Sequence, residues 1–263
     1  MKGIILAGGT GTRLLPSTAV TSKQLLPVYD RPMIFYPLNT LVMAGIKDIL
    51  IIVAPEYSGH FLNLLGSMFR NHGVSISFIV QKKPRGLADA YILAEDFLDG
   101  GSSTMVLGDN IFEDDFSDAI RSFEEGGRIF AKEVSDPKRF GVVEFDAEKK
   151  VVSIEEKPLV PKSNFAIPGI YIFDGRVSEA AKKLSPSERG EIEITGIHNY
   201  YLERGMLDVR EMKGEWFDTG TPDSLLDSSL YVREKGITKR FHPIVNDAIA
   251  EFTVEFKKMV ALR

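Results

Sequence analysis

The sequence has no cysteine among its 263 residues. This absence excludes a disulfide scaffold, a thiolate nucleophile and a zinc site with cysteine ligands. The chain also has no excess of positive charge, because its formal net charge is −5 at pH 7. It therefore lacks the general basic field that would hold nucleic acid or an anionic membrane surface. We expect neither partner, and an anionic ligand would need a local cluster of basic side chains.

Long hydrophobic runs are lacking as well. The first run, IILA, ends at a glycine, which makes it too short for a signal peptide or a membrane span. The shares of apolar residues (44%) and charged residues (26%) are ordinary for a globular protein. We therefore expect a cytoplasmic protein with a sizeable core.

Short apolar runs alternate with helical patterns in the first half of the chain. The runs predict buried strands over residues 2–7, 48–53, 75–80 and 104–107. The spacing of apolar residues predicts helices over residues 33–44, 58–69 and 87–98. Strands that alternate with helices in this way are typical of a mostly parallel sheet with helices on both faces. The predicted fold class is α/β.

After about residue 128 the pattern changes to shorter strands. We expect a meander of strands over residues 128–134, 141–145, 151–156 and 164–173. Helices near 177–184 and 194–203 follow, then a strand pair over 207–211 and 215–218, and a helix from Pro222. Because no internal repeat or polar linker occurs, we predict one compact domain with a C-terminal helical tail.

The stretch LAGGTGTRLLP (residues 6–16) directly follows the first predicted strand. It is not a dinucleotide-binding fingerprint, because Leu14 stands where the third glycine should be. It is not a Walker A loop either, because no lysine follows Gly11. Two interpretations remain: a plain tight turn, or a turn whose N–H groups bind an anion with Arg13 as the charge partner. Lys23 follows closely, and the two cations together would suit a polyphosphate.

Three charged residues stand at strand ends. Asp109 ends TMVLGD and Asp218 ends EWFD. Carboxylates at the ends of neighbouring strands can share one Mg²⁺ ion, but each can equally cap the next helix or turn. Lys157 follows a strand in EEKP, where a lysine is ordinarily half of a surface ion pair. On the residues alone, these alternatives stay open.

Several motifs together carry a family resemblance. LAGGTGTRLLP is followed by SKQLLPVYDRPMI, and this combination resembles the sugar-1-phosphate nucleotidylyltransferases, most closely the glucose-1-phosphate thymidylyltransferases. The resemblance extends over about residues 1–222, in the motifs QKKPRGLADAY, VLGDNIF, DPKRFGVVEFD, SIEEKPLVPKSNFAIPGIYIFD, SERGEIEIT and WFDTGT. It implies a Rossmann-like, three-layer α/β/α fold with a mixed, mostly parallel sheet. It further implies a catalytic domain over residues 1–222, with a nucleotide-binding half (1–127) and a sugar-binding half (128–222), and a short helical tail over 223–263.

The resemblance also implies a reaction. A sugar 1-phosphate, here α-D-glucose 1-phosphate, attacks the α-phosphorus of dTTP in line, which gives dTDP-glucose and pyrophosphate with Mg²⁺ as cofactor. The nucleophile is already an anion, so catalysis consists of positioning and charge neutralisation. Alternatives are UTP or another hexose 1-phosphate as substrate, and a non-catalytic regulator that binds nucleotide-sugars. All four histidines lie outside the motifs and are interpreted as core or surface residues: His60, His72, His198 and His242.

The family pattern assigns roles to individual residues. The catalytic cations are Arg13, Lys23 and Lys157, and the metal ligands are Asp109 and Asp218. A glutamine amide can pair with the N3–H and O4 edge that thymine and uracil share, so the residues themselves do not separate dTTP from UTP. The nucleotide-binding residues are Gly8, Gly9, Gly11, Thr12, Arg13, Lys23, Gln24, Gln81, Gly86 and Leu87. The sugar-binding residues are Asn110, Gly141, Glu156, Lys157, Ile167 and Tyr171.

The tail carries an apolar helical stripe. Two interpretations are open: the stripe packs on its own domain, or it packs against another subunit of a homo-oligomer. The stripe consists of Ile249, Phe252, Phe256, Met259 and Val260.

Overall fold

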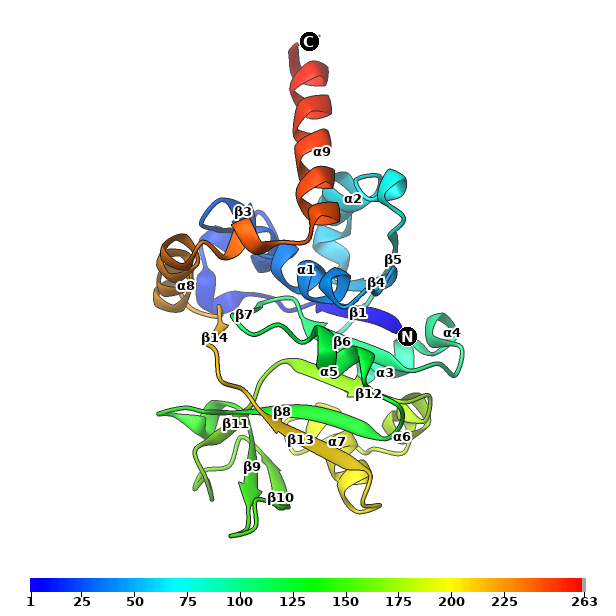
Figure 1. Cartoon of the computed structure of the whole chain (residues 1–263), viewed down its shortest axis with the longest axis vertical. Helices are drawn as coiled ribbons and strands as arrows, with labels where there is room; N and C mark the ends of the chain where they lie inside the picture. The colour runs from blue at the N-terminus through cyan, green and yellow to red at the C-terminus, as the bar shows by residue number, and fades with distance from the viewer. Residues whose placement is uncertain (262–263) are drawn as a thin grey trace.

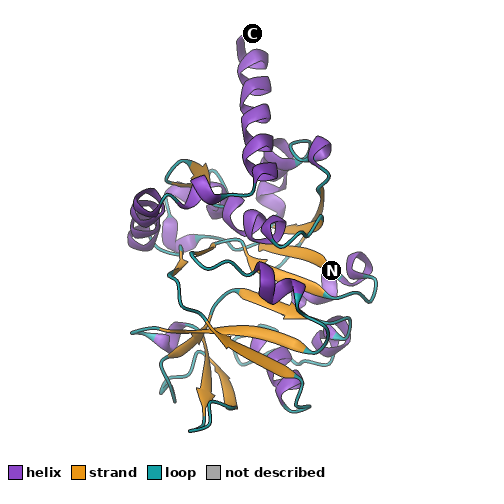
Figure 2. Cartoon of the chain, viewed as in Figure 1, coloured by secondary structure: helices purple, strands orange, loops and turns teal. Residues whose placement is uncertain are grey.

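One large sheet runs through the body of the molecule (Figure 1). The computed structural model describes residues 1–261. The strands of this sheet run in the order β10-β9-β11-β8-β12-β6-β1-β4-β5, and β13 pairs with β8. Helices cover both faces, which gives the expected three layers (Figure 2). The strands are β1 (Lys2–Ala7), β4 (Asp48–Val53), β5 (Ser75–Val80), β6 (Ser103–Leu107), β8 (Gly127–Glu133), β9 (Gly141–Phe145), β10 (Val151–Glu156), β11 (Phe165–Ile167), β12 (Ile170–Phe173) and β13 (Leu207–Glu211).

Two small sheets lie beside the main one. One pairs β2 (Pro27–Val28) with β3 (Arg31–Pro32), and the other pairs β7 (Asn110–Phe112) with β14 (Trp216–Asp218). The helices are α1 (Phe35–Met43), α2 (Ser58–Leu65), α3 (Asp89–Leu93), α4 (Glu95–Leu98), α5 (Ser117–Arg121), α6 (Val177–Lys182), α7 (Ile194–Leu202), α8 (Pro222–Lys235) and α9 (Pro243–Ala261).

The core lies on both faces of the sheet. Side chains of a strand point alternately to opposite faces. On β4, Ile49 and Ile51 therefore join the core under α1 and α2, whereas Leu50 and Ile52 join the core on the side of α3, α6 and α7. Burial on both faces explains why this strand is apolar without interruption.

The parallel part of the sheet sets the position of the site. Strands β6, β1, β4 and β5 all pair in parallel, so their carboxyl ends meet at one edge. Ligands of open α/β sheets bind at this edge. The glycine-rich loop follows β1, Gln81 follows β5, and Asp109 follows β6 there.

The observed bounds of β1, β4, β5, β9, β10 and β13 agree with the prediction. Two expected elements are interrupted. The helix over 87–98 is divided at Ala94 into α3 and α4, and the strand over 164–173 is broken at Pro168 and Gly169 into β11 and β12. The backbone N–H of Gly169 donates to Asn110 Oδ1 at 3.0 Å instead of to a neighbouring strand, and proline has no N–H to offer.

Two expectations about strand pairing were wrong. Strands β13 and β14 do not pair with each other: β13 runs parallel to β8, and β14 runs antiparallel to β7. The second half is not a plain meander either, because β11 lies between β9 and β8. Apolar alternation identifies a strand, but it does not identify the partner of that strand.

The tail leaves the body of the molecule. Thr221 caps the N-terminus of helix α8, where its hydroxyl accepts a hydrogen bond from the backbone N–H of Ser224 in a capping box. Helix α9 contacts α1 with its first half and then projects away (Figure 1). Ile249 and Phe252 pack against the core, whereas Phe256, Met259 and Val260 are about half exposed. Within residues 1–261, no helix is long and apolar enough to cross a membrane.

Candidate active site

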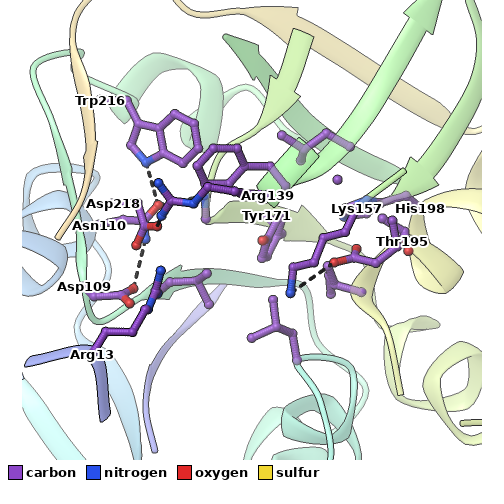
Figure 3. Close-up of a pocket in the computed structure, with 18 residues that line it drawn as sticks. Arg13, Asp109, Asn110, Arg139, Lys157, Tyr171, Thr195, His198, Trp216 and Asp218 are labelled. Atoms are coloured by element: carbon purple, nitrogen blue, oxygen red, sulfur yellow. Dashed lines mark hydrogen bonds and ion pairs between the residues drawn. The ribbon is translucent and has the colours of Figure 1, made fainter. Parts of the chain in front are cut away.

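A cavity of about 180 Å³ lies where the two halves of the sheet meet. Figure 3 shows Asp109, Asp218 and Arg13 on one side of it and Lys157, Thr195 and His198 on the other. Residues from all parts of the predicted catalytic region thus converge on one place. The predicted site residues that line the cavity are Arg13, Leu87, Asp109, Asn110, Gly141, Glu156, Lys157, Ile167, Tyr171 and Asp218.

The glycine-rich loop extends from this cavity toward solvent. Gly8 and Gly9 continue directly from β1, and Gly11 has a left-handed backbone (φ 63°) that favours glycine. Gly9 and Thr12 are exposed. Lys23 lies against the loop, because a Cβ placed on Gly9 would be 3.4 Å from Lys23 Cε. The ammonium group of Lys23 therefore lies close to the backbone of the loop.

The two predicted metal ligands are brought together by the β7–β14 ladder. Asp218 stands opposite Asn110 in this ladder, so it lies next to Asp109. The backbone N–H and the hydroxyl of Thr219 both donate to the carbonyl oxygen of Asp109, at 3.1 and 2.6 Å. We expected the two carboxylates at the ends of neighbouring strands. Asp218 does end a strand, β14, but Asp109 lies in the turn between β6 and β7, and the pairing of β7 with β14 brings the two carboxylates together.

The electrostatics of the pair suit a cation. Burial raises the pKa of Asp218, the charge of Asp109 raises it further, and the cations Lys23, Arg139 and Arg13 offset this only in part. Burial also acts to raise the pKa of Asp109, but the ion pair and hydrogen bond from Lys23 outweigh it, so that pKa is lowered. The two carboxylates are adjacent, and the charge of one raises the pKa of the other. Such a pair of oxygen ligands suits Mg²⁺.

In the part of the chain that the structure describes, no third acidic or histidine side chain completes this pair. Within residues 1–261 there is no group of three or more such side chains that could hold a metal ion by themselves. Mg²⁺ commonly uses only one or two carboxylates together with the phosphates of its substrate. The site thus fits a metal that arrives with a nucleoside triphosphate.

Arg13 reaches the acidic pair across a glycine. A Cβ at Gly220 would lie 2.6 Å from Arg13 Nη2, so a larger residue would push the guanidinium away. Gly220 follows the EWFD strand in WFDTGT and was not among the predicted site residues. Its role depends on a contact between residues far apart in sequence, which no local pattern indicates.

On the opposite side of the cavity, Lys157 lies beside Glu156. Lys157 Nζ is 3.8 Å from Glu156 Oε1, and Arg189 Nη2 is 3.7 Å from the same oxygen. Burial raises the pKa of Glu156 and the nearby Glu193 raises it further, while Lys157 and Arg189 oppose this. Lys157 has a positive φ of 42°, which is uncommon for a side-chain-bearing residue. Its backbone N–H donates to the carbonyl of Phe140 at 3.0 Å.

Three predicted nucleotide-binding residues that do not line the cavity make close contacts elsewhere: Gln24, Gln81 and Gly86. Gln81 Nε2 donates to Asp89 Oδ2 at 3.0 Å, and its Oε1 would lie 3.1 Å from a Cβ on Gly8. Gln24 is buried, with Oε1 accepting from the Ser22 hydroxyl. Gly86 packs against the backbone of Ile192, whose carbonyl oxygen would be 2.3 Å from an added Cβ.

Asn110 connects several parts of the site. Its Oδ1 accepts from the backbone N–H of Gly169 at 3.0 Å and from Trp216 Nε1 at 2.7 Å. Its Nδ2 donates to Asp109 Oδ1 at 2.9 Å. Asn110 lines the cavity, and its hydrogen bonds connect Gly169, directly before β12, to Asp109 of the acidic pair.

Sequence reasoning missed several residues that line the cavity. Arg139 and Phe140 belong to the motif DPKRFGVVEFD and Trp216 belongs to WFDTGT, so the motifs contained the signal although only Gly141 and Asp218 were chosen from them. His198 was interpreted as a core or surface residue. It is fully buried, as a core residue is, yet its ring also forms part of the cavity wall. The lining residues missed from the sequence are Leu107, Arg139, Phe140, Gly169, Ile194, Thr195, His198 and Trp216.

Comparison with known proteins gives consistent matches. The family described as "Nucleotidyl transferase" matches residues 2–235. A glucose-1-phosphate thymidylyltransferase of Mycolicibacterium smegmatis is 50% identical over 238 residues, which cover 89% of this chain and 82% of that protein. The enzyme of the same name from Neisseria meningitidis is 48% identical over 256 residues, which cover 95% and 88%.

Two solved structures are similar in fold. A crystal structure from Bacillus anthracis, described as a glucose-1-phosphate thymidylyltransferase in complex with sucrose, superposes with a TM-score of 0.86 at 44% identity. The match covers 94% of this chain and 99% of that one. A UDP-glucose pyrophosphorylase in complex with UDP-glucose superposes with a TM-score of 0.78 at 23% identity. The match covers 89% of this chain and 98% of that one. This second likeness concerns the fold alone.

Proposed function

The chain belongs to the nucleotidyl transferase family, and we propose that it is a glucose-1-phosphate thymidylyltransferase. It transfers a thymidylyl group from dTTP to α-D-glucose 1-phosphate, forms dTDP-glucose and releases pyrophosphate. The observation that carries the proposal is the convergence of Arg13, Lys157 and the Asp109–Asp218 pair on one cavity. A non-catalytic regulator would have no need for this complete set of charges.

The reaction needs charge neutralisation more than proton transfer. An oxygen of the sugar phosphate forms a bond to the α-phosphorus of dTTP, and the bond from that phosphorus to the oxygen bridging toward the β-phosphate breaks. The nucleophile and the leaving pyrophosphate are both anions, so repulsion is the main barrier to bringing them together. Arg13 on one side of the cavity and Lys157 on the other suit the triphosphate and the sugar phosphate respectively. Lys23, beside the glycine-rich loop, is the third proposed catalytic cation.

Asp109 and Asp218 are the proposed ligands of Mg²⁺. Enzymes of this family generally depend on a divalent metal ion. When bound, the ion supplies positive charge to the α-phosphate and the leaving pyrophosphate. The two carboxylates hold this charge, and the ion pair from Lys23 together with the hydrogen bonds of Asn110 and Thr219 fixes Asp109 in place.

Gln81 is the proposed reader of the base. Its Nε2 donates to Asp89, which orients the amide group, and its Oε1 is the proposed acceptor of the N3–H of thymine. Uracil carries the same N3–H, so this contact does not choose between dTTP and UTP. The preference for dTTP rests on relatives at about 50% identity, which are named thymidylyltransferases.

We further propose the division of labour along the chain that its motifs suggest. Residues 1–127 bind the nucleotide, residues 128–222 bind the sugar, and 223–263 form the tail, of which 262–263 lie outside the described residues. The protein is proposed to be a homo-oligomer. The half-exposed side chains of Phe256, Met259 and Val260 at the end of α9 support a contact between subunits.

Pyrophosphate release, measured over a grid of nucleoside triphosphates and sugar 1-phosphates, tests the function. The expected result is the highest kcat/KM with dTTP and glucose 1-phosphate. A clear preference for UTP or for another hexose 1-phosphate would replace the substrate and keep the reaction class. No turnover with any pair, together with measurable binding of dTDP-glucose, would support the regulator instead.

A further inference from the structure

His198 is a buried polar residue in the wall of the cavity. It lies on α7, one turn after Thr195, and both residues line the cavity (Figure 3). Its ring packs against Tyr171 and Phe173 of β12, with centroid separations of 5.3 and 6.0 Å. Neither ring nitrogen has a hydrogen-bond partner among the described residues. Burial lowers the pKa of His198 to about 3, so the neutral ring offers one N–H donor and one acceptor nitrogen.

A buried polar atom without a partner is unfavourable and is rare in folded proteins. A phenylalanine would fill the same aromatic surroundings without this cost. The same cavity contains a second case, because Glu156 Oε2 is also buried without a hydrogen-bond partner within residues 1–261. Lys157 and Arg13 supply charge for phosphates, whereas a neutral imidazole supplies none. A donor and an acceptor in one neutral ring match a hydroxyl group, which itself donates and accepts.

We propose that His198 is a specificity-determining residue that hydrogen-bonds one hydroxyl group of the hexose ring. This inference rests on the proposed function and assigns a further residue to the proposed sugar-binding half of the protein, residues 128–222. Because both ring nitrogens are buried in this structure, the proposed contact requires the ring to rotate about its Cβ–Cγ torsion, whose energy profile is broad. A site built to bond a hydroxyl group rejects an analogue that lacks it, because its own polar group is then left unpaired.

The test compares glucose 1-phosphate with its 2-, 3-, 4- and 6-monodeoxy analogues, with dTTP held constant. In the wild type, kcat/KM should fall at least about 10-fold for the analogue that lacks the bonded hydroxyl group. For each analogue, the ratio of interest is kcat/KM with glucose 1-phosphate divided by kcat/KM with the analogue. In His198→Phe, this ratio should approach one for the analogue that lacks the bonded hydroxyl group, while the ratios for the other analogues stay unchanged. The thermal unfolding temperature of His198→Phe should be equal or higher, since two unpaired nitrogens are removed. His198→Leu provides a second apolar variant if phenylalanine disturbs folding.

Tyr91→Phe is the matched control. Tyr91 is fully buried in the same core, and its hydroxyl group also lacks a partner, but it is not among the residues that line the cavity. Its removal should leave all ratios unchanged. The proposal is overturned if the wild type accepts all analogues equally, if His198→Phe keeps every ratio, or if Tyr91→Phe loses the same one. If the wild type turns over no sugar 1-phosphate, the proposed function fails. The role of His198 is then tested by calorimetry, from the dissociation constants of glucose 1-phosphate and of its deoxy analogues.

Discussion

Arg139 donates a hydrogen bond from Nη2 to Oδ2 of Asp218 at 3.0 Å. On the other side of the acidic pair, Lys23 forms an ion pair with Asp109. Each carboxylate therefore has its own cation in the protein without ligands. A metal ion that binds both carboxylates must compete with these cations and, on the acid side, with protons.

The first prediction concerns the acid limb of the pH profile. Burial and the charge of Asp109 raise the pKa of Asp218, and Arg139 is one of the cations that oppose this. Activity that needs ionised Asp218 is lost as the pH falls through this raised pKa. Arg139→Gln removes an opposing cation, so the acid limb of kcat/KM should move to higher pH at low Mg²⁺. Saturating Mg²⁺ should move the limb to lower pH, because the metal favours the ionised form.

Profiles of kcat/KM against pH at two Mg²⁺ concentrations measure this shift. Arg121→Gln is the control, since Arg121 is exposed and forms its ion pair with the exposed Asp118. If the acid limb lies at the same pH in the wild type and in Arg139→Gln, and does not shift with Mg²⁺ concentration, then ionisation of Asp218 does not control the acid limb of the profile.

The second prediction concerns metal binding. Asp109→Asn and Asp218→Asn should each lower kcat by roughly 10²-fold or more, because charge that stabilises the transition state is lost with the metal. Calorimetric titration of Mg²⁺ into the protein with dTTP should show weaker binding in both variants. Asp118→Asn, at a side chain that is 98% exposed, should bind Mg²⁺ as the wild type does. Wild-type metal affinity in either active-site variant would make that aspartate a turn residue only.

The third prediction concerns Lys157. Lys157→Ala should lower kcat by roughly 10²–10³, by analogy with the loss of one preorganised donor to a transition-state oxyanion. It should also raise the KM for the sugar 1-phosphate. Lys149→Ala is a matched control, since Lys149 also has a positive φ (60°) but its side chain is 87% exposed. Steady-state kinetics decide the matter, and near-normal kcat and KM in Lys157→Ala would remove this lysine from the site.

Much of this site could be predicted from sequence because its residues stand in contiguous motifs at strand ends. The bounds of β10 and the position of Lys157 directly after it follow from local apolar alternation. Gly220 and Arg139 act on Arg13 and Asp218 through space, over long stretches of chain. Local patterns carry no information about such contacts. The pairing of β14 with β7, which makes Asp109 and Asp218 neighbours, is likewise a tertiary feature.

The fourth prediction separates steric clash from backbone strain. Gly86 has φ 103° and lies against the backbone of Ile192, whereas Gly190 has φ 75° and open space around its Cα. Gly190→Ala should lower the free energy of unfolding by roughly 1–2 kcal/mol, the cost of a left-handed backbone with a Cβ. Gly86→Ala should cost roughly 1–3 kcal/mol more, because the backbone of Ile192 must move. Urea denaturation measures both values, and equal losses would show that the contact relaxes freely.

The fifth prediction concerns the end of α9. The rings of Phe252 and Phe256 stack with their centroids 6.0 Å apart, and the stripe that begins on the core at Ile249 continues past the body of the molecule. Burial of a phenylalanine stabilises by roughly 1.5–3 kcal/mol, which favours covering Phe256 and Met259 with a second subunit. Sedimentation velocity of the wild type should therefore show an oligomer. Phe256→Glu should shift the population toward monomer, with no loss of thermal stability in the monomeric domain.

Val254→Glu is the control for this shift. Val254 is 52% exposed and Phe256 is 50% exposed, so both substitutions place a charge at an equally accessible position. Two residues correspond to about 200° around a helix, so Val254 lies on the side opposite the stripe. If only the stripe contacts another subunit, Val254→Glu leaves the oligomer intact while Phe256→Glu dissociates it. Equal effects of the two changes would point to a general effect of charge on the helix, and a monomeric wild type would contradict the contact altogether.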